Sequence, residues 1–418
     1  MNVVAKIKNA SLYPLAYAIV SVQSVVARMK ALGKRPVVHF EQPYQGQKIL
    51  LLALYEKGRL RPDIENLLIT AKSLGMYVLT VNTFKLLKPD SLKDKVDCYI
   101  ERPNFGRDFG SYKTGFLHVY EKGWEQQCER LLMLNDSLFY SKANLESFIK
   151  QMITTEIEVL GATENFDEEY HLGSFCISFS KTIIKKTIFK QYWLSYRNSN
   201  LRPKVIENGE KALSMTIKRS ISDAASMRAL FDVTWLSNVF RKKPSLIDAV
   251  INLCRDSKHP WPQPTMKNIS GVVTEKYLFE DFMFANIEAN IEANIEAGEL
   301  FAVSSLKDLI SAIQSSCSSD NATIKELVCG VAKNKILSDF KVGSQIHQNA
   351  ILLHGFGLPI VKLDVLYRGV LSVRDIEEIA NQLLEEERSL FLYQMHSRPF
   401  GSDTLTGWRR AAFNQGLI

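Results

Sequence analysis

The sequence predicts an α/β protein whose mostly parallel sheet is flanked by helices. Short apolar segments rich in β-branched residues alternate with segments in which apolar residues recur at helical spacing, and this alternation is typical of parallel sheets. The 418 residues are 46% hydrophobic and 23% charged, which is a globular composition. A chain of this length can bury a large core, either as one α/β domain with an appendage or as two domains.

The strands are predicted where short apolar runs end in polar residues. They are expected at residues 35–40, 76–81, 97–100, 130–134 and 158–163, with a further strand within 171–179. The helices are predicted where apolar residues return every three or four positions. They are expected at residues 49–55, 63–74, 109–120 and 183–193, and Gly75 ends the second. Ligands collect at the carboxyl ends of parallel strands, so the polar residues at 101–110 and 135–137 are expected on a ligand-binding edge.

Three regions are expected along the chain. Residues 1–34 form an N-terminal amphipathic helix, residues 35–255 form the α/β domain, and residues 256–418 form a helical region that folds back on the core. Within the last region, residues 259–264 are Pro-rich and predict a rigid, extended loop. The Asn-Ile-Glu-Ala repeat at 286–297 predicts a surface helix without a catalytic role.

The N-terminal segment is apolar from residue 11 to residue 31, and four basic residues lie in or after its end: Arg28, Lys30, Lys34 and Arg35. The segment is too short and too polar for a membrane span. A signal peptide is not expected, because the basic cluster follows the apolar run. An amphipathic helix is the prediction, and it either lies on a membrane surface or packs on the domain.

Cysteine usage and charge define the compartment and the partners. None of the six cysteines forms a Cys-x-x-Cys pair, so no zinc or redox motif is expected and the protein is predicted to be cytoplasmic. The net charge of +7 is spread along the chain without a dense basic arm. Nucleic acid is therefore not an expected partner, whereas phosphate ligands or an anionic membrane are. Hydrolase, Walker-type and metalloprotease motifs are absent from the sequence.

Two motifs dominate the middle of the chain. Residues 99–115 form a polar, Gly-punctuated loop with two Arg, one Lys and one Asp. Residues 131–137 form a buried-type strand that ends in Asn-Asp-Ser. A basic loop beside a strand-terminal carboxylate suits the diphosphate of a nucleotide sugar, so the pair predicts a glycosyltransferase.

Residues 102–112 and 134–137 together resemble the rhamnan synthesis protein F family, whose members are bacterial glycosyltransferase-like proteins of cell-wall, capsule and O-antigen lipopolysaccharide synthesis. Further blocks are similar at residues 161–164, 171–175, 207–214 and 358–366. The resemblance implies a GT-A-like, Rossmannoid sheet and a nucleotide-diphosphate sugar as donor, with rhamnose or a related deoxysugar as the candidate sugar. It also implies a polysaccharide or lipid-linked glycan as acceptor.

The donor site is expected to use the two motifs and the end of the first strand. Arg102, Arg107 and Lys113 are expected to neutralise phosphates, and Gly106 and Gly110 to allow close backbone approach, unless they form only a structural turn. The full predicted donor-binding set is His39, Arg102, Asn104, Gly106, Arg107, Asp108, Gly110, Tyr112, Lys113, Asn135, Asp136 and Ser137.

A divalent metal is predicted at Asp136. The Asn-Asp-Ser motif departs from the Asp-x-Asp of many GT-A enzymes and offers one carboxylate. One carboxylate and the diphosphate together can hold Mg²⁺ or Mn²⁺. Two alternatives stay open: the basic residues replace the metal, or Asp136 serves as a helix N-cap.

The general base is expected to be a carboxylate or histidine within reach of the acceptor oxygen. Glu164 follows a predicted strand, and His171 opens the block at 171–175. Asp167 is a further candidate, while Glu210 rests mainly on the resemblance. Two other functions compete with transfer: a non-catalytic nucleotide- or glycan-binding subunit of a polysaccharide assembly complex, and a nucleotidyl- or phosphotransferase on the same scaffold.

Overall fold

The computed structural model describes residues 3–166, 169–253, 306–307, 310–311, 321–398 and 400–418. Asp167, the loop predicted at 259–264 and the repeat at 286–297 lie outside the described residues. The chain divides into two compact units, one formed by Met1–Leu230 with Leu353–Ile418 and the other by Phe231–Leu352.

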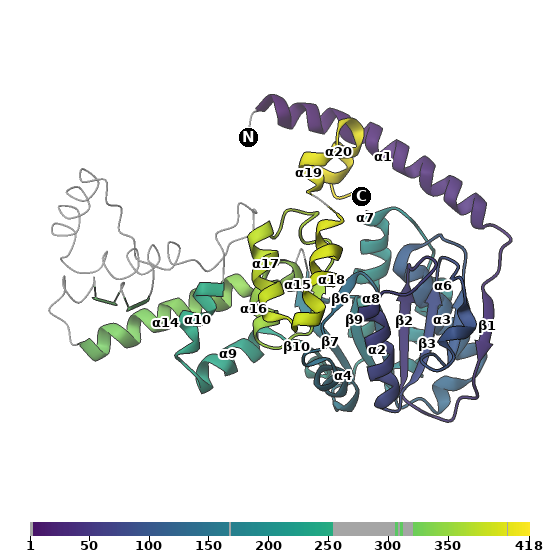
Figure 1. The fold of residues 1–418 in the computed structure, drawn as a ribbon, viewed down its shortest axis with the longest axis horizontal. Coiled ribbons are helices and arrows are strands. Elements are labelled where there is room, and N and C mark those ends of the chain that lie inside the picture. Colours follow the sequence, from purple (N-terminus) through teal and green to yellow (C-terminus); the bar gives the residue numbers. More distant parts are fainter. Residues whose placement is uncertain (1–2, 167–168, 254–305, 308–309, 312–320, 399) are drawn as a thin grey trace. The chain divides into compact units, whose positions relative to one another are not determined.

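The first unit is built on a nine-stranded sheet within the described residues. The strand order is β1-β4-β3-β2-β5-β9-β7-β10, with β8 paired to β7. The bounds are β1 Val37–Glu41, β2 Ile49–Leu54, β3 Tyr77–Asn82, β4 Cys98–Glu101, β5 Arg130–Asn135, β7 Val159–Asn165, β8 His171–Leu172, β9 Cys176–Ser180 and β10 Met227–Phe231. Strands β4, β3, β2 and β5 are parallel, whereas β1 and β9 run antiparallel to their neighbours. The predicted α/β class is confirmed, as a mixed sheet with a parallel centre (Figure 1).

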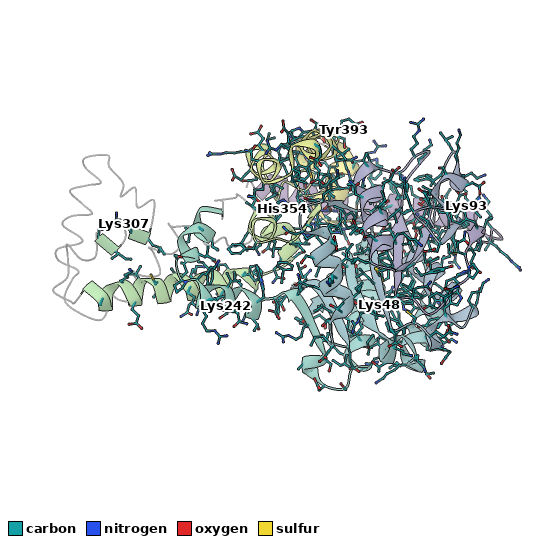
Figure 2. All side chains as sticks on the ribbon, turned by 60° about the horizontal axis from the view of Figure 1, so that its bottom comes forward. Lys48, Lys93, Lys242, Lys307, His354 and Tyr393 are labelled. Carbon is teal, nitrogen blue, oxygen red and sulfur yellow. The ribbon has the colours of Figure 1, made fainter. Side chains whose placement is uncertain are left out.

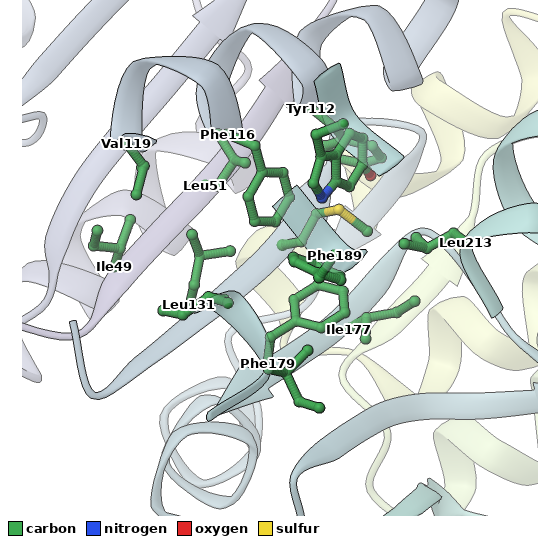
Figure 3. Packing of buried hydrophobic residues seen from close by; sticks show 14 of the residues in the cluster. Ile49, Leu51, Tyr112, Phe116, Val119, Leu131, Ile177, Phe179, Phe189 and Leu213 are labelled. Carbon is green, nitrogen blue, oxygen red and sulfur yellow. The ribbon is translucent and has the colours of Figure 1, made fainter. Parts of the chain in front are cut away.

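Helices cover both faces of this sheet. On one face, α3 (Arg107–Glu121) contacts β2 and β3, and α6 (Thr187–Ser195) contacts α3. On the other face, α2 (Pro62–Ser73) contacts β3 and α4 (Leu145–Thr154) contacts β5. The core under α3 contains Leu51, Phe116 and Phe179 (Figure 3). A Cβ added to Gly115 of α3 would lie 2.2 Å from Cδ1 of Leu51, so the glycine leaves room for the Leu51 side chain of β2 beneath the helix.

One predicted element is wrong. Residues 49–55 were expected to form a helix, but Ile49–Leu54 is β2, in the middle of the sheet. Every residue of β2 is buried, so the strand reads as a continuous apolar run without the alternation that marks a half-exposed strand. The strands predicted at 76–81, 97–100, 130–134 and 158–163 are confirmed within one or two residues.

The end of the chain belongs to the first unit. β11 (Ile360–Lys362) pairs antiparallel with β6 (Leu138–Tyr140), which follows β5. The helices α17 (Val373–Gln382), α18 (Glu385–His396), α19 (Gly401–Thr404) and α20 (Gly407–Asn414) complete this part. The Glu387 carboxylate of α18 accepts hydrogen bonds from the Ser141 hydroxyl and the Lys142 N–H, and Phe391 packs edge-to-face on Phe139. Charged side chains such as Lys93 extend from the surface of the first unit (Figure 2).

The second unit is helical in its described residues. It contains α9 (Val233–Lys242), α10 (Leu246–Leu253), α14 (Asn321–Phe340) and α15 (Gln345–Gln348), and α14 contacts both α9 and α10. The Asp232 carboxylate caps α9 by accepting from the Trp235 N–H. Helix α16 (Ala350–Gly355) crosses the boundary at residue 352.

The N-terminal helix α1 (Val3–Ala31) packs on α20 through a small apolar cluster. Ala16 and Val20 contribute from α1, and Ala411 and Ala412 contribute from α20. Other apolar residues of α1 are exposed: Leu15, Val22, Val25, Val26 and Met29. The segment Leu12–Ala31 is long and apolar enough to cross a membrane, judged by length and composition alone. Its mean hydropathy is 1.2, and 17% of it is buried within the protein.

Candidate active site at the carboxyl edge of the sheet

The parallel strands bring their carboxyl ends to one edge of the sheet. β5 ends at Asn135, and β7 is parallel to β5 because both are antiparallel to β9. The basic loop after β4 therefore meets the Asn-Asp-Ser motif after β5, and the Asn135 side-chain amide donates to the Asp108 carboxylate at 3.0 Å. Asn135 also accepts from the Ser137 hydroxyl at 2.6 Å, which fixes the turn.

Asp136 is a buried acid, not a helix N-cap. The chain continues from it into β6, and its carboxylate accepts from the Tyr55 backbone N–H instead. Arg61 donates to the main-chain carbonyls of Asp136 and Leu138, at 2.8 and 2.7 Å. Burial and the neighbouring charge of Asp108 raise the pKa of Asp136 to about 7, although the Tyr55 N–H and Arg61 act in the opposite direction.

Asp108 and Asp136 are the carboxylates at this edge that could hold a divalent cation. Asp108 lies close enough to the buried Asp136 for its charge to oppose ionisation of Asp136. A cation bound to both carboxylates would relieve that repulsion. Carboxylate oxygens are the ligands that Mg²⁺ and Mn²⁺ take in proteins. The sequence predicts the metal on Asp136 alone, because Asp108 lies in the other motif and is brought near Asp136 only by the fold.

Arg107, which lies beside Asp108, is also close to other arginines. Desolvation by the surrounding protein lowers the pKa of Arg107, as do the charges of Arg368 and Arg398, whereas the charge of Asp108 raises it. Burial and the charges of Arg368 and Arg107 lower the pKa of Arg202 to about 10. We call Arg107, Arg202 and Arg368 the arginine cluster. Arginines that lie close together can bind an anion, because the anion offsets the repulsion between their charges.

Lys362 joins this site from β11. Its ammonium donates to the Ser137 hydroxyl at 2.8 Å and lies 4.7 Å from the centre of the Phe175 ring. Burial lowers the pKa of Lys362, whereas the charges of Asp364, Asp108 and Glu210 raise it. The sequence analysis noted the segment 358–366 without assigning Lys362, Arg202, Arg368 or Arg398 to the site, since none of them lies in a recognisable phosphate motif.

Two predicted phosphate ligands are used inside the protein. The Arg102 guanidinium donates to the carbonyls of Pro103, Phe105 and Arg107 and to the Ser111 hydroxyl. The Lys113 ammonium donates to the carbonyls of Leu194 and Tyr196 at the end of α6. Arg102 holds the loop and Lys113 holds the end of α6, and their donors are used by oxygens of the protein itself.

The two glycines of the loop meet protein atoms. Gly106 has a φ of +106°, and a Cβ there would lie 2.7 Å from Asn198. A Cβ on Gly110 would lie 2.9 Å from the Arg102 guanidinium carbon. Loop packing therefore accounts for both glycines, as the structural-turn alternative expected.

The remaining predicted donor ligands are spread over the first unit. Asn104 is exposed in the loop, and Tyr112 is buried in the core with its hydroxyl donating to the Ser174 carbonyl at 3.1 Å. His39 lies on the edge strand β1, paired with Glu101 at 2.9 Å. Because β1 is separated from β5 by β4, β3 and β2, the structure does not bring His39 to Asp136.

The candidate bases come together on the neighbouring strands. Glu210 lies on a π-helical turn, Ile206–Lys211, and its carboxylate accepts from the Ser174 hydroxyl at 3.0 Å. His171 Nε2 lies 4.0 Å from the other Glu210 oxygen. Such turns widen the helix and occur often at functional sites. Glu164 is 5% exposed in β7, whereas the Glu210 side chain is 31% exposed, so Glu210 is the accessible carboxylate.

The fold is that of an α/β protein with polar and charged side chains gathered at the carboxyl ends of its parallel strands. Residues 80–246 match the family model described as rhamnan synthesis protein F, which confirms the predicted resemblance. The matched range contains both motifs and the blocks with His171 and Glu210.

Individual relatives match parts of the chain. The "Uncharacterized protein y4gN" of Sinorhizobium fredii is 25% identical over 201 residues, which cover 46% of this chain and 51% of that protein. The "Virulence protein VirA" of Vibrio anguillarum is 33% identical over 132 residues, or 31% of this chain and 41% of that protein. This chain thus spans about half or less of these relatives. The glycosyltransferase GlyE of Streptococcus pneumoniae aligns over 48% of this chain and 50% of its own, at 13% identity and a TM-score of 0.27, which supports no assignment of function.

The different contacts of Arg102 and Arg107 predict different effects of their substitution on the free energy of unfolding. Arg102→Lys should lower the free energy of unfolding by about 2–4 kcal/mol, since a lysine cannot reproduce the fork and buried carbonyls lose their donors. Arg107→Ala should change it by less than about 0.5 kcal/mol, as is usual for an exposed side chain. Urea unfolding of both variants measures this, and equal losses would contradict the assignment.

The raised pKa of Asp136 predicts a specific pH dependence. The folded state holds the Asp136 proton more tightly than the unfolded state, so this residue's contribution to stability falls as pH rises from the usual carboxyl pKa through about 7. Relative to Asp136→Asn, the wild type should lose about 3 kcal/mol between pH 5 and pH 8, because each of the two units below 7 carries about 1.4 kcal/mol. If the free energies of unfolding of the two proteins change equally with pH over this range, the raised pKa of Asp136 is wrong.

Proposed function

We propose that this protein is a glycosyltransferase that moves a sugar from a nucleotide-diphosphate donor onto a bacterial surface polysaccharide. The observation that carries the proposal is the convergence of the Asp108–Asp136 pair with the arginine cluster at one sheet edge. The match of residues 80–246 to the rhamnan synthesis protein F family supports the same function. Rhamnose is our candidate sugar, and the acceptor is an O-antigen, capsule, cell-wall or lipid-linked glycan.

The donor diphosphate is bound by the arginine cluster. Arginine presents a planar fork that matches phosphate oxygens, and clustering allows several oxygens to be held at once. The α3 N-terminus begins at Arg107 and adds its positive dipole end to the same edge. Asp108 and Asp136 would hold Mg²⁺ or Mn²⁺, which supplies charge neutralisation for the departing diphosphate. Lys362, held by Ser137 and Phe175, orients the turn that carries these acids.

Glu210 is our choice for the general base. Its carboxylate is oriented by the Ser174 hydroxyl and lies near His171, and its charge acts on Lys362 and Arg202. We place the approach of the acceptor hydroxyl on this side of the site. Removing the hydroxyl proton as the new glycosidic bond forms makes the acceptor oxygen a better nucleophile. His171 then acts as a positioning residue for Glu210.

Nucleotide binding tests the donor site. Thermal shift with dTDP, UDP, GDP and their sugars, with and without Mn²⁺, should give one selective stabilisation, since ligand at 100 times its Kd adds about 2.7 kcal/mol. Arg202→Ala and Arg107→Ala should abolish it. Arg219→Ala removes the same charge from an exposed position on this unit and should retain it. EDTA should weaken donor binding.

The same assay separates transfer from simple binding. Glu210→Gln should keep the nucleotide shift and lose sugar transfer by 10²- to 10⁴-fold, the usual size of a base contribution. Absence of a shift with every nucleotide would reject the proposal in favour of a glycan-binding subunit. Release of nucleoside monophosphate in place of diphosphate would indicate a nucleotidyl- or phosphotransferase.

We further propose that α1 holds the enzyme at the cytoplasmic face of a membrane. Val22, Val25, Val26 and Met29 form an exposed apolar stripe, while Ala16 and Val20 face α20. Arg28 and Lys30 in the last turn suit anionic headgroups. The helix would lie in the interface with its stripe among the acyl chains.

Vesicle sedimentation tests this orientation. Val22→Gln with Met29→Gln should reduce binding to phosphatidylglycerol vesicles about tenfold, because withdrawing two apolar side chains from lipid costs more than about 1.4 kcal/mol. Ile69→Gln alters an exposed apolar residue on α2 and should bind as the wild type does. Equal sedimentation of all three proteins would exclude the α1 surface.

A further inference from the structure

Three side chains from separate elements meet at the end of the sheet opposite the proposed active site. Glu41 ends β1, Cys98 begins β4 and His118 lies in the last turn of α3. Glu41 Oε2 lies 2.6 Å from His118 Nε2, and Cys98 Sγ lies 3.7 Å from that nitrogen and 3.9 Å from that oxygen. The Cys98 residue is fully buried, whereas the Glu41 side chain is 23% exposed, so the cluster opens to solvent on the side of Glu41.

These distances are close to those of a tetrahedral zinc site. With bonds of about 2.3 Å to sulfur and about 2.0 Å to nitrogen and oxygen, ligand atoms lie roughly 3.3–3.6 Å apart. The two separations from sulfur exceed this range by a few tenths of an ångström. The Glu41–His118 hydrogen bond must lengthen by about 0.7 Å, a movement within reach of a rotation of the partly exposed Glu41 side chain.

The surroundings also suit zinc. Lys122 donates to Glu41 Oε1 at 2.6 Å, which leaves Oε2 toward Cys98 and His118. Such a partner for the second carboxylate oxygen orients a ligand without blocking it. One thiolate and one carboxylate neutralise the two charges of the ion. Burial raises the pKa of the Cys98 thiol, so zinc binding would release its proton to solvent.

We propose that Glu41, Cys98 and His118 bind a zinc ion with one remaining position open to water. The ion would tie the edge strand β1 to β4 and to α3. β1 needs such a link because it pairs with one neighbour and its register shifts between Val38 and Phe40. The site is independent of the proposed Mg²⁺ or Mn²⁺ position, since Cys98 starts β4 and Asp136 follows the opposite end of the parallel strands.

Metal titration of the chelator-treated full-length protein tests the site. One equivalent of Co²⁺ should produce a thiolate-to-cobalt charge-transfer band, and Zn²⁺ should displace the cobalt and remove the band. Cys98→Ser should abolish the band, and Glu41→Gln should weaken Zn²⁺ binding at least tenfold. Cys128→Ser, at another fully buried cysteine of the same core, should behave as the wild type does.

Asp136→Ala separates this metal from the one in the proposed active site. It should retain the cobalt band and the zinc stoichiometry even where nucleotide binding is lost. A missing band in the wild type, or a band that survives Cys98→Ser, would overturn the zinc site. If Cys98→Ser fails to fold, unchanged zinc affinity in folded Glu41→Gln overturns it as well.

Discussion

The parallel packing of β4, β3, β2 and β5 is the constraint on which the rest of the first unit depends. These strands are buried on both faces, so their polar termini are confined to the two edges of the sheet. At the carboxyl edge, the Asn82 side chain bridges Glu56 and Tyr99, and the Asp136 N–H donates to the Ala53 carbonyl. These hydrogen bonds connect separate loops at the carboxyl ends of the strands and fix the positions of the residues in the candidate site.

Burying the Asp136 carboxylate next to Asp108 disfavours its ionised form. A carboxylate near another carboxylate in a buried position destabilises the fold when it ionises, and apolar replacement of such groups is often tolerated. The fold nevertheless places the Tyr55 N–H and Arg61 beside Asp136, and both favour its ionised form. A buried acid with a raised pKa at the carboxyl ends of parallel strands is the feature on which the proposed metal site rests.

The sequence predicted the sheet and the two motifs because their signals are local. β3 and β5 are bounded by clear turns, and Arg107 and Asp136 lie within a few residues of a strand end. The helix predicted over β2 failed because burial on both faces removes alternation. Arg102 and Lys113 were taken for phosphate ligands since a sequence does not show which basic groups find backbone carbonyls. Arg202 and Arg368 are not predicted from the sequence, because residues that the fold brings together from distant segments share no local sequence pattern.

The chain returns to the first unit after residue 352 and adds residues to the candidate site. Lys362 and Arg368 come from beyond the second unit, yet β11 pairs with β6 immediately after Asp136. Residues 231–352 are therefore an insertion between two segments that the sheet already holds. The antiparallel β6–β11 pair thus holds Lys362 against Ser137, next to Asp136, although residues 231–352 separate it in the sequence from the strands of the sheet.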